Sequence, residues 1–529
     1  MLSWRGLVAA ALLARLGLAS HQFHLSLVGN SVVTAGNVDY MLDWVTPSGV
    51  DSSVLIYGSS ATSLNKEIEA RGAGAVEEDD ASVECWSALL HDLKPGQTIY
   101  YAIKGDTEDD AEPKSFTVPK GDITWAVFGD LAAPMQKQAA GVSLPALKEE
   151  CDKGVYQGIV NLGDLGYELV KKNGQNYMEE LEHITSKVPM LATIGNHEHE
   201  HAMSPEFALQ NFQRRFASYG LGAGTVSGSA SPEFFSYNSG LIHFVFINTE
   251  IYGNEAYFAL QEDGSWKPDE KERREMAALQ ADWLAYDLSR VNREETPYVV
   301  VCTHRPPFKT PLSLSTAGNK FVKEILPLLS EYNVDLYLAG HEHTYLYFEE
   351  SEYLNYRVPP IIISGSSGNN EYIREIEEIK MEGFEQKVVI PKYGYGYLTA
   401  TKKALKWKWG STGSDSSHTP KPEMWTLEDE QTIPRRDIPS AAEKVGKPIK
   451  EPEAVQVAWG VAGSGASSGS TAGDADYLDK DSPMGTVAAS NGTNNKKSPT
   501  PTPSASSAKS LMSSLLGIQF VVIITWFLG

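Results

Sequence analysis

Side chains that bind metal ions follow five predicted strands of the 529-residue chain. They are two carboxylates, one amide, three imidazoles and one phenol: Asp130, Asp164, Asn196, His304, His341, His343 and Tyr167. Ligands of α/β sheets bind beyond the carboxyl ends of the strands, so we expect these side chains to meet there. Mixed nitrogen and oxygen donors without thiolate exclude a structural zinc finger and suit Fe, Zn, Mn or Ni. Seven ligands with one bridging carboxylate fit two metal ions, and such a pair can clamp a phosphate and activate water.

Each of these motifs has a simpler explanation when it is taken alone. Asp130 could cap the helix that follows it, and His304 could be a packed histidine. The segment 195–198 could be a turn, because Gly and Asn tolerate a left-handed backbone. Their common order, each at a strand end, favours the metal site over these alternatives.

Strands that alternate with helices predict a layered α/β sheet between residues 121 and 430. The predicted strands are 124–130, 158–164, 188–194, 233–237, 241–248, 298–304, 334–341, 360–364 and 396–409, and the predicted helices are 144–152, 176–187, 271–291 and 320–332. Alternating Lys and Trp in 402–409 indicate an edge strand with one solvated face. Residues 20–120 consist of short alternating segments between Pro/Gly turns, which is typical of a β-sandwich.

Both ends of the chain predict delivery through the secretory pathway to the cell surface. Residues 1–19 have the apolar run and small terminal residues of a signal peptide. Residues 431–510 are predicted to be a disordered stalk rich in Ser, Gly and Pro, with a glycosylation acceptor at Asn491. Residues 511–529 are apolar and lack a basic tail, which favours a glycolipid-anchor (GPI) signal over a transmembrane helix.

Composition narrows the possible partners. The chain has 68 acidic and 45 basic residues and a formal net charge of -23, which argues against a nucleic-acid binder. A small anionic substrate stays possible, because a bound cation can invert the local field. The three cysteines, Cys85, Cys151 and Cys302, are too few for a disulfide framework; at most one pair can form, and we expect small buried side chains. Nothing in the sequence indicates an oligomeric state.

Five sequence blocks resemble those of the calcineurin-like metallophosphoesterases. They are Gly129-Asp130-Leu131, Gly163-Asp164-Leu165-Gly166-Tyr167, Gly195-Asn196-His197-Glu198, Thr303-His304 and Gly340-His341-Glu342-His343. Tyr167 is the residue that is specific to the purple acid phosphatases within that superfamily. The resemblance extends over residues 20–430. It implies a fibronectin-III-like N-terminal domain at 20–120, followed by a layered αββα catalytic domain whose closing block is Tyr393–Tyr397.

The resemblance also implies a role for each ligand. Asp130, Asp164, Tyr167 and His343 would bind Fe(III), whereas Asp164, Asn196, His304 and His341 would bind a divalent ion (Zn, Mn or Fe), with Asp164 as the bridge. Charge transfer from tyrosinate to iron would colour the enzyme. The implied activity is that of an acid phosphatase, in which metal-bound hydroxide attacks a phosphate monoester. The alternatives are a metallophosphoesterase acting on nucleotides or diesters with another metal pair, and a non-catalytic surface binding protein on the same fold.

Asn196 and His197 would contact the substrate, and His197 would orient it or donate a proton to the leaving alcohol. His199 and His201 are expected to be loop residues. The chain departs from its plant relatives after His304, where they carry a pair of histidines and this sequence has none before His341. Arg305 or Lys309 could hold the phosphate there instead. A smaller departure is Ala132, at a position where the family usually has Gly.

Overall fold

The structure is a computed structural model that describes residues 20–438, apart from 32–35, 79–80, 107–111, 135–139, 200–208, 253–256, 264, 309–321, 370, 372, 374–379, 382 and 414–419. The predicted signal peptide, the apolar tail, Asn491, His201 and Lys309 therefore lie outside the described residues, as does the predicted stalk from residue 439 on. No helix among the described residues is long and apolar enough to cross a membrane.

The first part of the described chain is a sandwich of two four-stranded antiparallel sheets. One sheet has the order β1 (His21–Val28), β3 (Val38–Pro47), β7 (Ser82–Leu93) and β6 (Arg71–Glu77), and the other has the order β5 (Lys66–Glu69), β4 (Val54–Gly58), β8 (Thr98–Ile103) and β9 (Lys114–Thr117). Aromatic rings fill the space between them: Phe23 stacks on Trp44 and meets the edge of Tyr101. The alternating sequence thus buries one face of each strand.

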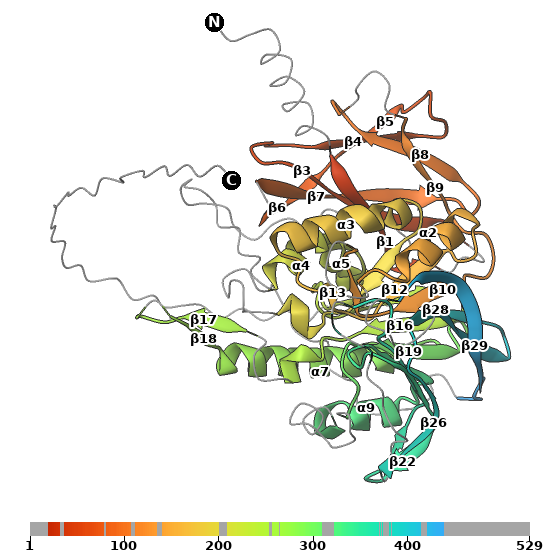
Figure 1. Cartoon of the computed structure of the whole chain (residues 1–529). Coiled ribbons are helices and arrows are strands. Elements are labelled where there is room, and N and C mark those ends of the chain that lie inside the picture. Colours follow the sequence, from red (N-terminus) through yellow and green to blue (C-terminus); the bar gives the residue numbers. More distant parts are fainter. Residues whose placement is uncertain are drawn as a thin grey trace, which may run out of the picture. The chain divides into compact units, whose positions relative to one another are not determined.

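Two larger sheets follow in the chain (Figure 1). The six-stranded sheet has the order β14 (Met190–Ala192), β12 (Gly158–Asn161), β10 (Trp125–Phe128), β27 (Gly394–Ala400), β28 (Ala404–Gly413) and β29 (Pro422–Pro434). The nine-stranded sheet has the order β2 (Asn30–Ser31), β15 (Phe235–Ser239), β16 (Ile242–Phe246), β19 (Tyr298–Cys302), β20 (Leu336–Ala339), β24 (Ile361–Ser364), β21 (Tyr345–Phe348), β26 (Phe384–Ile390) and β25 (Lys380–Met381). Short two-stranded pairs join β11 (Leu131–Ala132) to β13 (Leu165–Gly166), β17 (Phe258–Leu260) to β18 (Trp266–Pro268), and β22 (Ser351–Tyr353) to β23 (Tyr356–Val358).

The two sheets face each other across an aromatic core. Trp125 of β10 meets the rings of Tyr237 and Phe244 edge to face, and Trp409 of β28 stacks on Tyr345 of β21. The strands β10, β12, β19 and β20 are buried along their whole length. Such continuous apolar runs are typical of parallel strands covered on both faces, and β10–β12 and β19–β20 are indeed parallel pairs.

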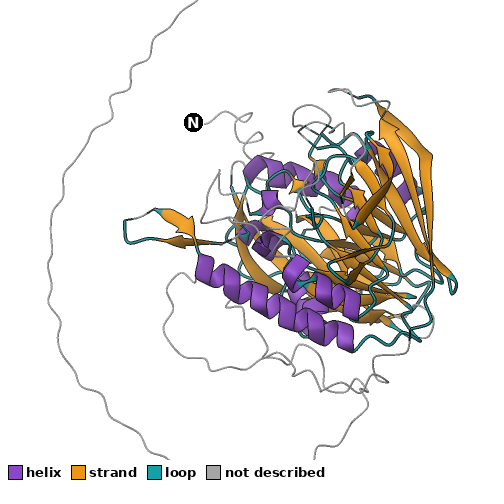
Figure 2. Cartoon of the chain, turned by 90° about the horizontal axis from the view of Figure 1, so that it is seen from below, coloured by secondary structure: helices purple, strands orange, loops and turns teal. Residues whose placement is uncertain are grey.

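Helices form the outer layers (Figures 1 and 2). On the side of the six-stranded sheet lie α2 (Leu144–Asp152) and α3 (Lys171–Thr185), and on the side of the nine-stranded sheet lie α7 (Glu270–Ser289) and α9 (Leu326–Glu331). Short helices fill the connection from β14 to β15: η1 (Asn196–Glu198), α4 (Gln210–Arg215), α5 (Ala217–Tyr219), η2 (Gly220–Gly224) and α6 (Thr225–Ser227). Asp287 of α7 accepts hydrogen bonds from Ser236 Oγ (2.5 Å) and His243 Nε2 (2.9 Å), which holds that helix on β15 and β16. The predicted fold, a β-sandwich followed by layered αββα architecture, is confirmed.

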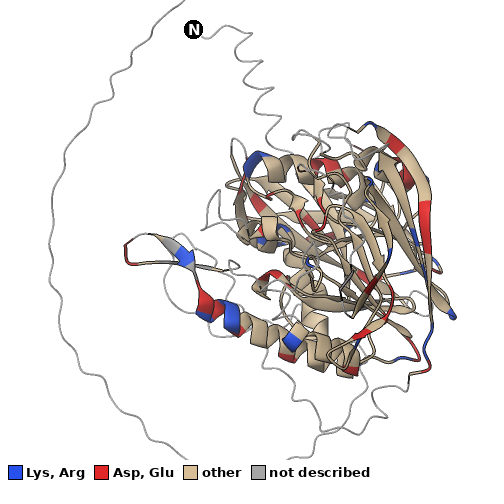
Figure 3. Cartoon of the chain, turned by 60° about the horizontal axis from the view of Figure 1, so that its bottom comes forward, with Lys and Arg blue, Asp and Glu red and all other residues tan. Residues whose placement is uncertain are grey.

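Two predictions about the last strands were wrong. The Lys/Trp segment is not an edge strand, because β28 lies between β27 and β29. Acidic residues of β29 (Figure 3) lie opposite the lysines of β28. Lys408 Nζ lies 3.1 Å from Glu430 Oε1 across this strand pair. The predicted stalk boundary at 431 was also too early, since β29 runs to Pro434 and stays paired with Ala404. The sandwich and the layered sheets belong to one unit by their contacts, and the domain boundary at 120 stays a prediction.

The described chain ends beside the amino ends of the central strands. Arg435 N donates to Lys403 O (2.8 Å), and Arg436 contacts Glu350 and Asp335, the latter at 3.7 Å. Asp335 directly precedes β20 and is itself held by Arg293 Nη1 at 2.5 Å. This buried carboxylate therefore fixes the exit of the chain to the central sheet.

Candidate metal centre

Four of the predicted ligands have a backbone conformation that side-chain-bearing residues rarely adopt. The φ angles are 59° at Asp130, 55° at Asp164, 51° at Tyr167 and 68° at His341. A non-glycine residue in this left-handed region costs on the order of 1–3 kcal/mol and persists only when its surroundings enforce it. All four lie in the turns that follow the carboxyl ends of β10, β12 and β20, so each of these turns carries a strained residue at the site.

A first group of donors comes together around His343. Its Nε2 lies 2.8 Å from Tyr167 Oη and 3.2 Å from Asp130 Oδ1. Oδ1 of Asp130 is buried and accepts no hydrogen bond from the residues that the structure describes, whereas Oδ2 accepts from the backbone N–H of His341 at 2.9 Å. A carboxylate fixed through one oxygen, with the other directed at an imidazole and a phenol, is a suitable metal ligand.

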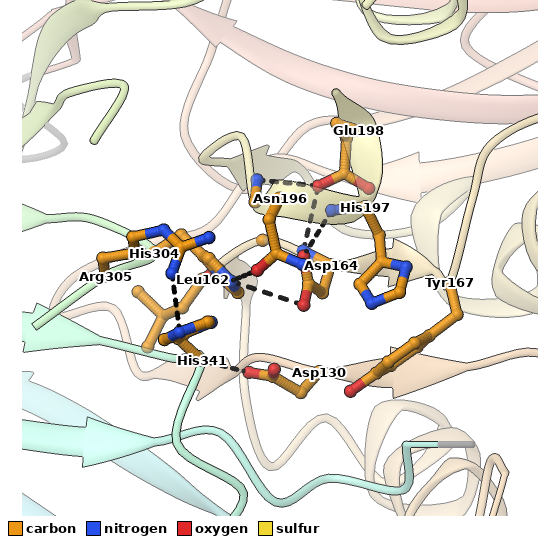
Figure 4. A network of polar contacts seen from close by, with 12 residues as sticks. Asp130, Leu162, Asp164, Tyr167, Asn196, His197, Glu198, His304, Arg305 and His341 are labelled. Atoms are coloured by element: carbon orange, nitrogen blue, oxygen red, sulfur yellow. Dashed lines mark hydrogen bonds and ion pairs between the residues drawn. The ribbon is translucent and has the colours of Figure 1, made fainter. Parts of the chain in front are cut away.

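A second group lies beside the first (Figure 4). Ligand atoms of Asp164, His304 and His341 lie within 4.8 Å of one another. His304 Nε2 is 3.3 Å from Asp164 Oδ2 and 3.1 Å from Asn196 Oδ1. The other ring nitrogen of His304 donates to Leu162 O at 2.8 Å, which fixes the ring and directs Nε2 at Asp164 and Asn196.

Glu198 holds the two loops that carry these ligands. Its carboxylate is buried and accepts three backbone N–H groups, from Asp164 (2.9 Å), Leu165 (2.8 Å) and Gly195 (2.7 Å). The sequence motif contained Glu198, but no role was predicted for it. These three hydrogen bonds tie the two loops to one carboxylate. They therefore hold Asp164 in its left-handed conformation.

Burial and charge set the titration of the site. Burial lowers the pKa of His304, but the carboxylate of Asp164 outweighs this effect and raises it to about 10. Burial raises the pKa of Glu198 to about 8, with a further contribution from the charge of Asp164. Burial and the adjacent Arg305 hold the pKa of His341 well below its ordinary value. The pKa shifts therefore come from burial and from direct electrostatic contact between carboxylates and imidazoles.

Glycines leave the space that the ligands occupy. A Cβ at Gly340 or Gly365 would lie 2.6 or 2.8 Å from Asp130 Oδ2, and one at Gly163 would lie 2.7 Å from His304 Nδ1. At Gly195 it would collide with Asp164. The glycines that directly precede Asp164, Asn196 and His341 are thus required by close approach.

The sequence-predicted residues outside the two groups are also placed. The ring of His197 lies 4.5 Å from that of Tyr167, its backbone N–H donates to Asp164 Oδ1 (3.0 Å), and its buried Nδ1 has no hydrogen-bond partner among the described residues. Arg305 Nη1 lies 2.8 Å from His341 Nε2. His199 lies away from the ligands, buried against Tyr257. The cysteines Cys85, Cys151 and Cys302 are buried and have free thiols, which agrees with the expectation of small buried side chains.

Two acidic residues at the site were not predicted from the sequence. Glu250 binds Arg305, and Glu371 Oε2 lies 3.6 Å from His343 Nδ1. Glu250 comes two residues after the predicted strand 241–248, so it carried the same strand-end signal that identified the other residues. Glu371 had no such signal.

Comparison of the sequence and the fold with known proteins shows which class of protein the chain resembles. Residues 123–345 match the family of calcineurin-like phosphoesterases, and these residues carry all seven predicted ligands. The chain is 26% identical over 337 residues to "Acid phosphatase type 7" of Mus musculus, which covers 58% of this chain and 68% of the relative. It is 28% identical over 303 residues to "Probable inactive purple acid phosphatase 9" of Arabidopsis thaliana, over 49% of this chain and 42% of the relative. The solved purple acid phosphatase PPD1 from yellow lupin (Lupinus luteus) has the same fold, with a TM-score of 0.53, 14% identity, and coverage of 79% of this chain and 75% of that one.

The chain thus contains a calcineurin-like phosphoesterase domain. It is an enzyme of that type, and its homologues include proteins named acid phosphatase type 7 and purple acid phosphatase.

Proposed function

We propose that the chain hydrolyses small phosphate monoesters at a centre of two metal ions. The observation that carries this proposal is the meeting of two adjoining donor groups where strand ends of both large sheets form one edge of the layers. They are Asp130, Tyr167 and His343 in the first, and Asp164, Asn196, His304 and His341 in the second. One group is rich in anionic oxygen and suits Fe(III), whereas the other is rich in imidazole and suits a divalent ion such as Zn, Mn or Fe.

The donors fit such a pair of ions. Asp130 offers a buried oxygen without a hydrogen bond, and the four glycines keep the space around the ligand atoms open. Asp164 has its Oδ1 on the His197 N–H and its Oδ2 toward His304, so its carboxylate is the natural bridge. Two bound cations would acidify water and neutralise phosphoryl charge.

The protein residues would then position the substrate. Asn196 directs its side-chain oxygen at His304, which leaves its amide hydrogens for a phosphoryl oxygen. His197 lies against Tyr167 at the same edge and would give a proton to the leaving alcohol. Arg305 would bind the phosphate in place of the histidines that the plant relatives carry, although a guanidinium cannot serve as the proton donor.

One experiment separates this proposal from the alternatives. Purified protein is analysed for metal content, visible absorption and hydrolysis of an aryl phosphate across acidic and neutral pH. We expect two metals per chain including iron, a broad visible band, and hydrolysis that is faster in acid. Active protein without iron or colour would support a different metal pair. Metal-loaded protein that is inert to every phosphate ester would support a non-catalytic role, which one relative's name, "probable inactive", makes worth testing.

We further propose that residues 1–19 direct secretion and that residues 511–529 are exchanged for a glycolipid anchor. Their composition supports this proposal. Release of activity from intact cells by a phospholipase specific for such anchors would test it, and activity that stays with the cells would favour a retained helix.

A further inference from the structure

Arg305 is bound at two ends of its guanidinium group. Its Nε lies 2.8 Å from each carboxylate oxygen of Glu250. Its Nη1 lies 2.8 Å from Nε2 of His341 (Figure 4). The Glu250 side chain is 6% exposed, whereas that of Arg305 is 29% exposed. A buried anion therefore holds a partly exposed cation at the rim of the proposed metal centre.

The segment that carries Glu250 is rigid. Asn248 Oδ1 accepts the backbone N–H of Glu250 (2.9 Å), and Gln280 of α7 binds both the backbone N–H (2.7 Å) and the backbone C=O (3.1 Å) of Asn248. The neighbouring Thr249 Oγ1 accepts the backbone N–H of Arg305 at 2.9 Å. The same short segment after β16 thus fixes both the backbone and the side chain of Arg305.

The contact between Arg305 and His341 has only one possible polarity. A guanidinium donates hydrogen bonds and cannot accept them, so the lone pair of His341 Nε2 is the acceptor. That lone pair is also the one His341 would offer to a divalent ion. When a cation takes it, the Nη1–H of Arg305 loses its acceptor and a positive charge is left close to the ion.

A phosphoryl group would replace the lost hydrogen-bond acceptor of Nη1 and would also compensate the positive charge. Its oxygens accept charge-assisted hydrogen bonds from a planar guanidinium, and its negative charge offsets the repulsion between the guanidinium and the cation. We propose that Arg305, positioned by Glu250, couples the two ligands of the site: it opposes metal binding at His341 when phosphate is absent and binds the phosphoryl group when the metal is present. This inference rests on the function proposed above.

Coupling of this kind predicts effects of opposite sign. In R305M the proposed divalent site loses a nearby positive charge, so we expect the metal to be retained against a chelator at about threefold or higher chelator concentration. Inhibition by inorganic phosphate should become at least about tenfold weaker, because a charge-assisted hydrogen bond is lost. Loss of packing alone would weaken metal and phosphate binding together. R290M, at the exposed end of α7, is the matched control and should change neither.

Two further variants isolate the role of each partner. R305K keeps the charge without the planar fork, so metal retention should stay near that of the wild type while phosphate inhibition weakens. E250Q removes the anion that positions Arg305, so both metal retention and phosphate inhibition should fall. In the E250Q/R305M double variant, E250Q should add little to the loss of phosphate inhibition, because the two residues act as one unit.

The outcomes are distinguishable. Wild-type protein that binds no metal and hydrolyses no ester would overturn the proposed function and the inference with it. Active, metal-loaded wild-type protein whose R305M and R305K variants keep normal phosphate inhibition would overturn the inference alone. The same holds for an R305M variant, folded by its melting temperature, that loses metal more easily than the wild type.

Discussion

Oη of Tyr167 lies 2.8 Å from Nε2 of His343, and the same nitrogen lies 3.2 Å from Oδ1 of Asp130. Three side chains from three different strand ends thus direct their donor atoms at a common point. Tyr167 reaches it because its own backbone is left-handed, with φ at 51°.

Replacing Tyr167 with Phe should bleach the visible colour more than it lowers activity. The phenol is the proposed source of the charge-transfer band, but Asp130 and His343 would still hold the ion. Absorption spectra and turnover of an aryl phosphate are measured on the same sample. Y219F is the control, since Tyr219 is equally buried and donates to Met190 O at 3.1 Å, away from the predicted ligands. A Y167F protein with an unchanged band would contradict the assignment of the phenol.

Replacing Asp164 with Asn should abolish both metal binding and activity. The amide removes the proposed bridging charge between the two donor groups, and a loss of several kcal/mol in transition-state stabilisation corresponds to about a thousandfold or more in rate. Metal analysis and turnover check the prediction, with D152N on the surface as the control. Substantial turnover in D164N would mean that the two-metal assignment is wrong.

Replacing Glu198 with Gln should destabilise the site without touching a ligand. One of the two carboxylate oxygens becomes an NH₂ group that faces backbone N–H donors, which costs on the order of 1–3 kcal/mol for each group left unpaired. Metal affinity should fall by about tenfold to a hundredfold, as for other residues that orient ligands. Thermal unfolding and chelator competition measure the two effects. E295Q, at an exposed position, serves for comparison, and equal behaviour of both variants would count against this role.

Acid should loosen the contact between the sandwich and the catalytic layers. Glu78 is held by Arg215 Nη2 at 3.3 Å and by Gln22 Nε2 at 2.5 Å. Burial raises the pKa of Glu78, but His21 and Arg215 outweigh it and leave the pKa below its ordinary value. A lowered folded-state pKa contributes stability above the unfolded-state pKa, and that stability is lost as the pH falls through the folded-state value.

The variant E78Q tests this pH dependence. It should lower the melting temperature at neutral pH and flatten its decline in strong acid. The melting temperature is recorded as a function of pH for E78Q and for the wild type. Parallel curves would show that Glu78 contributes nothing to the acid sensitivity.

The sequence was sufficient to single out most of the predicted ligands, because they lie at or just after the ends of apolar strands. The carboxyl ends of parallel strands in one sheet lie at the same edge whatever the details of the loops, so Asp130 and Asp164 could be placed together before any coordinates existed. Their meeting with His341 depends in addition on how the second sheet packs on the first. The same logic would have added Glu250, which follows β16, if it had been applied to every strand.

Pairing between distant segments was harder to predict. The alternating lysines of β28 were read as a solvent-facing edge because their partners lie on a strand that begins nine residues later. Lys408 faces Glu430, and Lys406 Nζ lies 2.8 Å from Thr432 Oγ1. Charge alternation on both segments was visible in the sequence, but register depends on the hairpin geometry between them. The contact of Arg305 with Glu250 spans 55 residues and has no local signal at all.

Asp335 and His341 stand at opposite ends of β20, a strand of four residues that spans about 13 Å. The first binds Arg436, where the described chain leaves the sheet, and the second belongs to the metal centre. The point at which the described chain leaves the sheet and the metal centre are therefore separated by the length of one short strand. A segment that follows Arg436 begins at the end of β20 opposite to the proposed ligands, so it starts away from the position at which a phosphate ester would bind.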